Sequence, residues 1–371
     1  MNKMRILVTG HQGFVGKNLL VRLAEIDELI VLTFGRGNSP DELAELVANV
    51  DAVIHLAGEN RPSDPADFQL VNTQLTQLLC DALLKAESRA RILFTSSIQA
   101  DRDNDYGRSK KDAEMVLANY SAESGNPVVI YRLPNLFGKW CKPEYNSVVA
   151  TFCHHISQGL PIKINDESTS LRLVYIDDLI SKFISDLGEP LSGVVTGQVE
   201  PEYSATLGEL ATQIYAFKDS RGNLTTEPVG TGLTRALYST YMSYLRPEQF
   251  HYDLPSHADD RGVFVEMLKT RDSGQFSFFT AKPGIMRGSH YHHTKTEKFL
   301  IIQGRARFGF RHLVTNEKVE LEVSDEKYQV VETIPGWVHD ITNVGDNDLI
   351  VLIWANEVFD REAPDTIART V

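Results

Sequence analysis

The chain has 371 residues, with 42% hydrophobic and 23% charged side chains and a formal net charge of −13. This composition excludes a largely disordered chain, and the acidic balance argues against nucleic acid as a partner. No stretch approaches the roughly 18 uninterrupted apolar residues of a membrane-spanning helix, so no membrane association is expected. Three cysteines are too few for a disulfide framework and indicate a cytoplasmic protein, while the length predicts two domains.

The N-terminal half alternates apolar runs with amphipathic stretches of helical spacing. The runs are residues 5–10, 28–34, 51–58, 90–97 and 127–133. This rhythm predicts βαβ units, and so a Rossmann-type, doubly wound parallel sheet with helices on both faces.

The C-terminal third has a different sequence pattern, in which short β-rich runs follow one another between turn residues. The runs are residues 263–268, 275–281, 297–304, 306–312, 318–323, 328–335 and 349–356. They predict an all-β sandwich or barrel. We expect residues 233–245 to form a last helix that closes the first domain, which gives domains at 1–247 and 248–371.

A glycine-rich turn, TGHQGFVG, occupies residues 9–16 between the first predicted strand and the first predicted helix. Glycines allow the backbone to approach a pyrophosphate, and the helix N-terminus offers free N–H groups to it. The motif alone also fits a tight turn that binds nothing. Its position in a βαβ unit favours a dinucleotide site.

Tyr106 and Lys110 are four residues apart and therefore lie on one helix face, where the ammonium can lower the pKa of the phenol. Such a tyrosine can protonate a carbonyl oxygen while a hydride reaches the carbonyl carbon. Ser97, at the end of the fourth strand, is placed to hydrogen-bond the same oxygen. Each residue alone could be an ordinary surface residue, but the three together behind a glycine turn predict a reductase.

The second strand ends in Gly35-Arg36, without the carboxylate that usually holds the ribose hydroxyls of NAD. An arginine at this position can accommodate a 2′-phosphate, so Arg36 favours NADPH. The alternative is an exposed arginine in a glycine-rich turn.

The C-terminal region contains His290, His292 and Glu297, and a distant PGWVH segment ends in His339. The HxH spacing places two imidazoles on the same side of a strand, with His293 directed away. Three imidazoles and a carboxylate suit Zn, Fe, Mn or Ni, with coordination positions left open for chemistry, and zinc is our expectation.

The first 245 or so residues resemble extended short-chain dehydrogenases/reductases that act on nucleotide sugars. The matching motifs are TGHQGFVG, DAVIHLAGENRP, FTSS, YGRSK, RLPNLFGKW and LRLVYIDDLI, although the loop from Ser97 to Tyr106 is short for that family. The resemblance implies Ser97, Tyr106 and Lys110 as catalytic residues, and Asn135, Lys139 and Arg172 as substrate contacts. It implies a cofactor site formed by Gly10, Gly13, Phe14, Val15, Gly16, Arg36, Leu56, Ala57, Gly58, Asn72, Tyr106 and Lys110.

The last 120 or so residues resemble the cupin superfamily, a jelly-roll β-barrel, through the HxH, Glu297 and PGWVH motifs. The segments DDRGVFVE and RGSHY are also similar to metal-free cupin epimerases of 4-keto-6-deoxy nucleotide sugars. In those enzymes the histidine that corresponds to His290 is the base. His290 is therefore either a metal ligand or a catalytic base, and the sequence leaves both open.

Over its whole length the chain resembles bifunctional capsular polysaccharide biosynthesis enzymes of the CapF/WbjC/FnlB type. That resemblance implies an epimerase/reductase acting on a UDP-4-keto-6-deoxy-N-acetylhexosamine, on the route to UDP-N-acetyl-L-fucosamine. It implies carbon-3 epimerisation by the cupin, followed by NADPH-dependent reduction to UDP-2-acetamido-2,6-dideoxy-L-talose. By analogy with other cupins we expect a homodimer.

Two alternatives remain. A nucleotide-sugar 4-epimerase or dehydratase with a non-catalytic cupin would bind NAD tightly, which Arg36 disfavours. A dehydratase would also have an acidic pair after Ser97, where Ile98 and Gln99 stand. A non-enzymatic assembly or regulatory module would have no need of Ser97, Tyr106 and Lys110.

Overall fold

The computed structural model describes residues 3–259, 262–265, 267–270, 274–357 and 362–371. Its contacts divide the chain into two compact units. The first unit consists of Met1–Lys142 and Leu171–Ser204, and the second of Pro143–Ser170 and Ala205–Val371. Among the described residues, no helix combines the length and apolarity needed to cross a membrane.

The first unit is built on a six-stranded parallel sheet of order β2-β1-β3-β4-β5-β8. Its strands are β1 (Met4–Thr9), β2 (Leu29–Phe34), β3 (Ala52–His55), β4 (Arg91–Ser97), β5 (Val128–Leu133) and β8 (Val194–Thr196). The first five confirm the predicted strands. The sixth has only three residues, too few for a recognisable apolar run.

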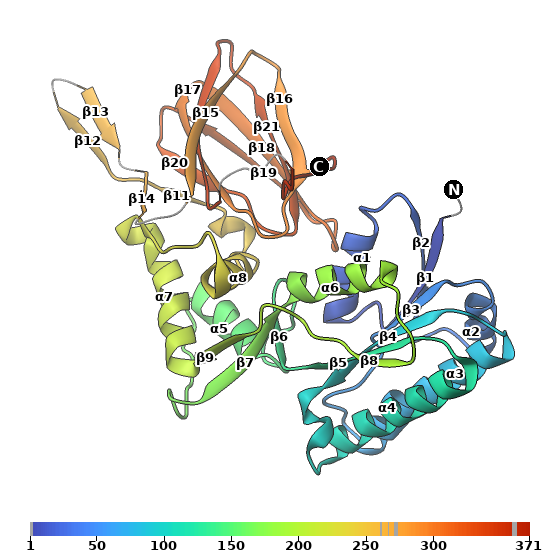
Figure 1. The fold of residues 1–371 in the computed structure, drawn as a ribbon. Coiled ribbons are helices and arrows are strands. Elements are labelled where there is room, and N and C mark those ends of the chain that lie inside the picture. The colour runs from blue at the N-terminus through green and yellow to red at the C-terminus, as the bar shows by residue number, and fades with distance from the viewer. Residues whose placement is uncertain (1–2, 260–261, 266, 271–273, 358–361) are drawn as a thin grey trace. The chain divides into compact units, whose positions relative to one another are not determined.

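Helices cover both faces of this sheet, as predicted (Figure 1). They are α1 (Phe14–Leu23), α2 (Pro40–Val47), α3 (Leu75–Lys85), α4 (Asp105–Ser124) and α6 (Ile176–Gly188), with short helical turns η1 (Phe68–Gln74) and η2 (Ile98–Asp101). One hydrophobic core joins α2, α3 and α4 to one face of the sheet. Three further strands, β6 (Asn135–Phe137), β7 (Ser170–Tyr175) and β9 (Tyr203–Thr206), form a small sheet.

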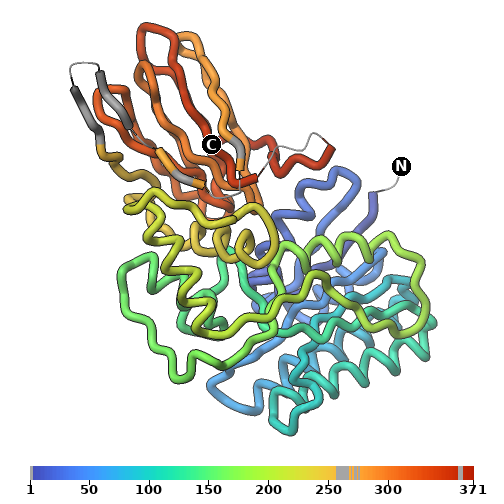
Figure 2. The backbone as a smooth tube through the Cα atoms, turned by 60° about the vertical axis from the view of Figure 1, so that its left-hand side comes forward, coloured from blue at the N-terminus to red at the C-terminus, as the bar shows by residue number. Residues whose placement is uncertain are grey.

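The second unit contains two five-stranded antiparallel sheets (Figure 2). One sheet has the order β11-β20-β17-β22-β15, with β11 (His251–Asp253), β20 (Gln329–Glu332), β17 (Glu297–Gln303), β22 (Leu349–Ala355) and β15 (Gln275–Ala281). The other has the order β19-β18-β21-β16-β23, with β19 (Lys318–Ser324), β18 (Arg305–His312), β21 (Trp337–Asn343), β16 (Met286–Tyr291) and β23 (Ile367–Ala368). This is the all-β architecture that the sequence predicts. Its core includes the aromatic side chains of Phe250, Phe299, Phe308, Phe310 and Trp337.

The smaller elements of the second unit are two short strand pairs and a helical turn. They are β10 (Thr225–Thr226) with β14 (Lys269–Thr270), β12 (Ser256–Asp259) with β13 (Gly262–Val265), and η3 (Pro247–Gln249). Asp260, Arg261 and Glu266, from the DDRGVFVE motif and the run 263–268, lie outside the described residues.

Three helices belong to the second unit as well: α5 (Val148–Ser157), α7 (Leu207–Asn223) and α8 (Gly232–Met242). The helix expected at residues 233–245 exists as α8, but it groups with the β-strands rather than closing the first unit. The reason is a set of polar contacts: Ser239 donates to the carbonyl of His293, and Arg221 of α7 pairs with buried Glu332. The second unit is therefore larger than segment 248–371.

Candidate active sites

The glycine turn has the close backbone approach that the motif predicts. Gly10 has a φ of +69°, and a Cβ placed on it would lie 2.6 Å from the amide nitrogen of Ala57. A Cβ on Gly16 would meet the carbonyl oxygens of Gly10 and His11 at 2.6 Å. Gly13 is the N-cap of α1, and Phe14 and Val15 form its first turn. Only glycine fits at the two crowded positions, and the helix N-terminus is consequently brought against the ends of β1 and β3.

The short connection between Ser97 and Tyr106 is a compact turn. Ser97 ends β4 and caps η2 by accepting a hydrogen bond from the amide of Gln99, the second residue of that turn. Asn104 caps α4 by accepting from the amide of Gly107, and a Cβ on Gly107 would lie 2.4 Å from the carbonyl oxygens of Gln99 and Arg102. The turn therefore brings the first turn of α4 directly onto the end of β4.

Ser97 and Tyr106 meet as the sequence predicts, but the pKa of the phenol shifts in the direction opposite to our expectation. Burial raises the pKa of Tyr106 above its usual value, and a hydrogen bond with Ser97 offsets only part of that rise. The expectation that Lys110 lowers the pKa of this phenol is wrong, because desolvation of the phenol dominates. Tyr106 stays protonated at neutral pH, which is the form that a proton donor to a ketone requires.

Lys110 is buried against the loop that follows β3. Its Nζ donates to the carbonyl oxygen of Thr95 at 3.0 Å and lies over the ring of Phe94. Burial lowers the pKa of this ammonium to about 8. A Cβ on Gly58 would lie 3.0 Å from the same Nζ, so the Gly58 backbone lies against the cation.

Asn72 acts on the loop that carries Leu56, Ala57 and Gly58. Its Oδ1 accepts from the amide of Glu59 at 2.8 Å, and its Nδ2 donates to the Glu59 carbonyl and to Ser109 Oγ. Because Ser109 belongs to α4, Asn72 ties this predicted cofactor-binding loop to the helix that bears Tyr106 and Lys110.

Arg36 follows the end of β2, and its exposed guanidinium pairs with Glu59 at 2.9 Å. Glu59 was not predicted from the sequence, because it follows β3 and therefore stands in no recognisable position of the second-strand pattern. The Glu59 carboxylate also accepts from the amides of Asn60 and Arg61, so it is held in place by its own turn. The ring of His11 packs against Gly35 beside this pair. A Cβ placed on Gly35 would lie only 2.8 Å from His11 Cε1.

The three predicted substrate contacts lie in one region of the first unit. Asn135 Nδ2 donates to the carbonyl of Arg172, whose exposed guanidinium pairs with Glu202 at 2.5 Å. Lys139 is fully buried, and its ammonium is neutralised by Asp177 at 2.7 Å. Substrate contact by these three residues stays a prediction.

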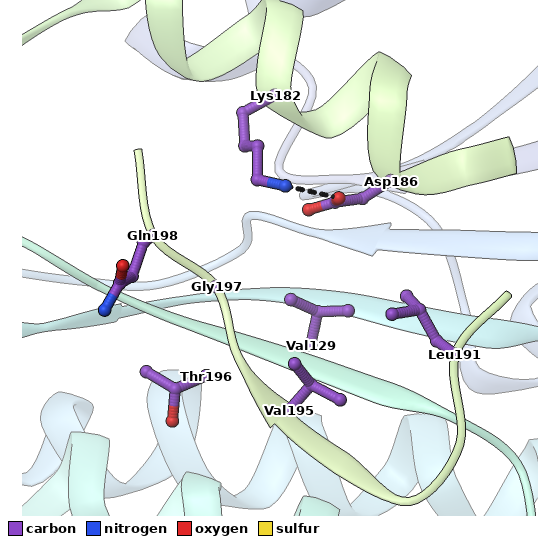
Figure 3. A pocket seen from close by; sticks show the side chains of 8 residues that line it. All are labelled: Val129, Lys182, Asp186, Leu191, Val195, Thr196, Gly197 and Gln198. Carbon is purple, nitrogen blue, oxygen red and sulfur yellow. Dashed lines mark hydrogen bonds and ion pairs between the residues drawn. The ribbon is translucent and has the colours of Figure 1, made fainter. Parts of the chain in front are cut away.

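A cavity of about 240 Å³ lies between α6 and the β5–β8 edge of the sheet (Figure 3). It contains none of the predicted site residues. Its buried acid, Asp186, is paired with Lys182 at 2.7 Å and accepts from the hydroxyl of Tyr131. The charges of this cavity are therefore satisfied within the protein, and we assign no chemistry to it.

The second unit brings His290, His292, Glu297 and His339 together as the HxH and PGWVH motifs predict. One ligand atom from each residue lies within 4.8 Å of the others. Glu297 Oε2 is 3.2 Å from His292 Nε2 and 3.5 Å from His339 Nε2. His293 is outside the cluster, and its ring packs against Tyr291.

A bulge in β16 sets the direction of His290. The β16–β21 ladder shifts register between Gly288 and His290, and both Gly288 and Ser289 have positive φ. A Cβ on Gly288 would come within 3.2 Å of the His339 carbonyl oxygen. Bulges next to active sites commonly re-aim one side chain, and here the re-aimed residue is the half-buried member of an otherwise buried cluster.

The protonation states of the cluster fit a bound metal. Burial and repulsion from the other imidazoles lower the pKa of His290 to about 3, and burial also lowers that of His339. The pKa of Glu297 lies well below its usual value in spite of desolvation by burial, because a hydrogen bond with His292 and charge interactions with His292 and His339 lower it. Both nitrogens of His339 are buried without a hydrogen-bond partner. Three imidazoles, of which His290 and His339 have lowered pKa values, one carboxylate and an unsatisfied buried nitrogen form a suitable ligand set for a divalent cation.

Two family models match the chain. Residues 6–194 match the NAD dependent epimerase/dehydratase family, and residues 257–367 match the polysaccharide biosynthesis C-terminal domain. The first match falls on the region of alternating strands and helices, and the second on the region of consecutive strands.

The similarity to other proteins extends over the whole chain. UDP-2-acetamido-2,6-beta-L-arabino-hexul-4-ose reductase of Pseudomonas aeruginosa is 55% identical over 368 residues, which cover 99% of each chain. The capsular polysaccharide assembling protein CapF of Staphylococcus aureus is 42% identical, with a TM-score of 0.68, 99% of this chain covered and 100% of the other. WbmF of Bordetella bronchiseptica, solved with NAD+, is 20% identical with a TM-score of 0.52 over 58% of this chain and 78% of its own. That last likeness concerns the fold alone.

Proposed function

We propose, on the premise that the chain belongs to the NAD-dependent epimerase/dehydratase family and within it to the CapF type of capsular polysaccharide enzymes, that it is a bifunctional nucleotide-sugar epimerase/reductase. Its substrate is a UDP-4-keto-6-deoxy-N-acetylhexosamine. The observation that carries the proposal is the meeting of Ser97 and Tyr106, in a chain alignable end to end with a hexul-4-ose reductase.

The reductase chemistry uses the first unit. When bound, NADPH would supply the hydride that carbon 4 of the sugar receives and would be released as NADP+. Tyr106, protonated at neutral pH, gives its proton to the oxygen that was the ketone, and Ser97 hydrogen-bonds that oxygen. The buried ammonium of Lys110 stabilises the phenolate that remains.

The epimerase chemistry uses the cluster in the second unit, which we propose is a cupin site. His290, His292, Glu297 and His339 would hold one divalent cation, with zinc as the proposed metal. When bound, such a cation polarises a carbonyl oxygen as a Lewis acid. The ketone at carbon 4 acidifies the proton at carbon 3, and return of a proton to the opposite face inverts that carbon. His290 is the most accessible imidazole of the cluster and remains neutral, so it also suits the role of base.

The order of the two reactions follows from the ketone. Epimerisation needs the ketone at carbon 4, and reduction removes it, so reduction after epimerisation makes the inversion irreversible. The product is UDP-2-acetamido-2,6-dideoxy-L-talose. We further propose that the protein works as a homodimer in a reducing cytoplasm, in keeping with its three free cysteines.

The test is to incubate the purified protein with the UDP-4-keto-6-deoxy-N-acetylhexosamine and NADPH, and to identify the product by NMR. We expect stoichiometric oxidation of NADPH and an inverted carbon 3 in the alcohol. Reduction without inversion would leave a simple 4-reductase. Tightly bound NAD, with no net consumption of NADPH, would instead support the 4-epimerase or dehydratase alternative.

A further inference from the structure

The segment 362–371 forms one side of the His/Glu cluster. Its strand β23 pairs with β16, so that Ala368 lies opposite His290 and Ile367 opposite Tyr291. The amide of Arg369 also donates to the carbonyl of Ser289 at 2.8 Å. The strand that bears His290 and leads directly into His292 is thus held along its edge by a segment about 75 residues further along the chain.

Asp365 contacts His292 and the loop that follows it. The Asp365 carbonyl oxygen lies 2.5 Å from His292 Nδ1, and a carbonyl can only accept, so Nδ1 must carry the proton. The lone pair of His292 is then on Nε2, the nitrogen that faces Glu297. The Asp365 carboxylate accepts from the amides of His293, Thr294 and Lys295 at 2.7–2.8 Å, which fixes the loop between the second and third candidate ligands.

Thr366 acts on Glu297 through a buried lysine. Lys295 Nζ donates to Thr366 Oγ1 at 2.9 Å and lies 3.5 Å from Glu297 Oε1. The other carboxylate oxygen, Oε2, faces His292 and His339. Since Lys295 is only 5% exposed, its ammonium is confined between the hydroxyl and the carboxylate, and it holds Glu297 with one oxygen turned toward the imidazoles.

We propose that Asp365 and Thr366 are positioning residues of the metal site, which set the orientation of His292 and Glu297. This inference rests on the proposed metal site. Groups that hold the far side of metal ligands fix the tautomer and ring orientation, and their loss typically weakens metal binding by about 10–100-fold. Neither residue belongs to a histidine, glutamate or PGWVH motif, and both reach the cluster only through the pairing of β23 with β16.

The experiment uses the full chain and compares wild type with Asp365→Ala, Thr366→Val, Thr366→Ser and Thr370→Val. Zn²⁺ affinity is measured by competition with a chromophoric chelator, and the visible spectrum of the Co²⁺-loaded protein reports ligand geometry. Thermal unfolding of the metal-free proteins checks the fold. Thr370 is the matched control, because its side chain is exposed and only its carbonyl is used, by Arg311.

We expect Asp365→Ala and Thr366→Val to weaken Zn²⁺ binding about 10-fold or more and to change the Co²⁺ spectrum. Thr366→Ser, which keeps the hydroxyl, and Thr370→Val should match wild type. Wild-type affinity and spectrum in both Asp365→Ala and Thr366→Val would overturn the positioning role while leaving the metal site intact. Failure of the wild type itself to bind either metal would overturn the metal site. Should Asp365→Ala not fold, the Thr366→Val and Thr366→Ser pair decides.

Discussion

His290 and His339 stand directly opposite each other in the ladder between β16 and β21, with ring centroids 4.6 Å apart. Antiparallel pairing thus joins two residues that are 49 positions apart in the sequence, and the β16 bulge turns the first toward the second. The two rings share a poorly solvated space, in which burial and repulsion from His339 lower the pKa of His290 to about 3.

From this arrangement we predict exchange of the sugar's carbon-3 proton with solvent in the absence of NADPH. Full-length protein is given the 4-keto substrate in deuterated water, and deuterium at carbon 3 is measured by NMR. If the metal activates the ketone, a chelator should stop the exchange. If His290 is a metal-free base, exchange should survive chelation but disappear in His290→Asn. A protein loaded with metal that incorporates no deuterium would contradict the two-site mechanism.

Tyr106→Phe should lower the reduction rate by about 100-fold or more, because the phenol's proton is needed only when carbon 4 receives hydride. NADPH oxidation is followed by absorbance, and carbon-3 exchange, which should persist, by NMR. Tyr120→Phe is the matched control on the same helix, since it removes a buried phenol that hydrogen-bonds Asn126 instead. A Tyr106→Phe variant that keeps more than a tenth of wild-type reduction would rule out this assignment.

The protein should prefer NADPH to NADH, and Arg36→Ala should raise KM for NADPH by about tenfold, equivalent to 1.4 kcal/mol, with little change for NADH. The loss is modest because the Arg36 guanidinium is largely exposed and already paired with Glu59. Arg89→Ala, which removes an exposed arginine next to the amino end of β4, is the control. Equal efficiency with both cofactors in the wild type would show that Arg36 reads no 2′-phosphate.

The reduction should lose efficiency as pH rises through about 8, the pKa to which burial lowers Lys110. The sign follows from the charge: above that pH the folded protein loses the cation, while Tyr106, with its raised pKa, is still protonated. The measurement is kcat/KM for reduction against pH. The arginine of Lys110→Arg keeps its charge across the range, so this variant should not lose kcat/KM near pH 8. Lys111→Arg, at the exposed neighbouring position, should lose it as the wild type does. If kcat/KM falls over the same pH range in all three proteins, the fall is due to the titration of another group.

Arg221→Ala should lower the free energy of unfolding of the second unit by about 3 kcal/mol, because it leaves the buried Glu332 carboxylate short of a partner. Glu332 is 1% exposed and pairs with both Arg221 and Lys298. Urea unfolding followed by the fluorescence of Trp337 and Trp354 measures the loss.

The control is Arg307→Ala, which breaks an exposed pair with Glu320 and should cost less than about 1 kcal/mol. Fragment 248–371 also lacks Arg221, so it should be less stable than the same strands in the full chain. Equal stability of Arg221→Ala and wild type would show that the helices of the second unit contribute little to its strands.

Several features were predictable because they depend on local periodicity. The five long parallel strands, the turn around Gly10 and Gly16, and the same-side direction of His290 and His292 follow from spacings within a few residues. Alternation, helical period and the steric demand of a tight turn leave a trace in the sequence wherever they act.

Other features were decided only when distant segments met. Glu59 reaches Arg36 because β3 lies beside β1, Asp365 reaches His292 because β23 pairs with β16, and α8 packs with strands that follow it. The direction of the Tyr106 pKa shift likewise depends on desolvation, which is a property of everything packed around the phenol. The sequence alone determined which chemical groups this protein has and how neighbouring ones are spaced. The tertiary structure decided their partners and their protonation, because contacts and burial depend on the three-dimensional path of the whole chain.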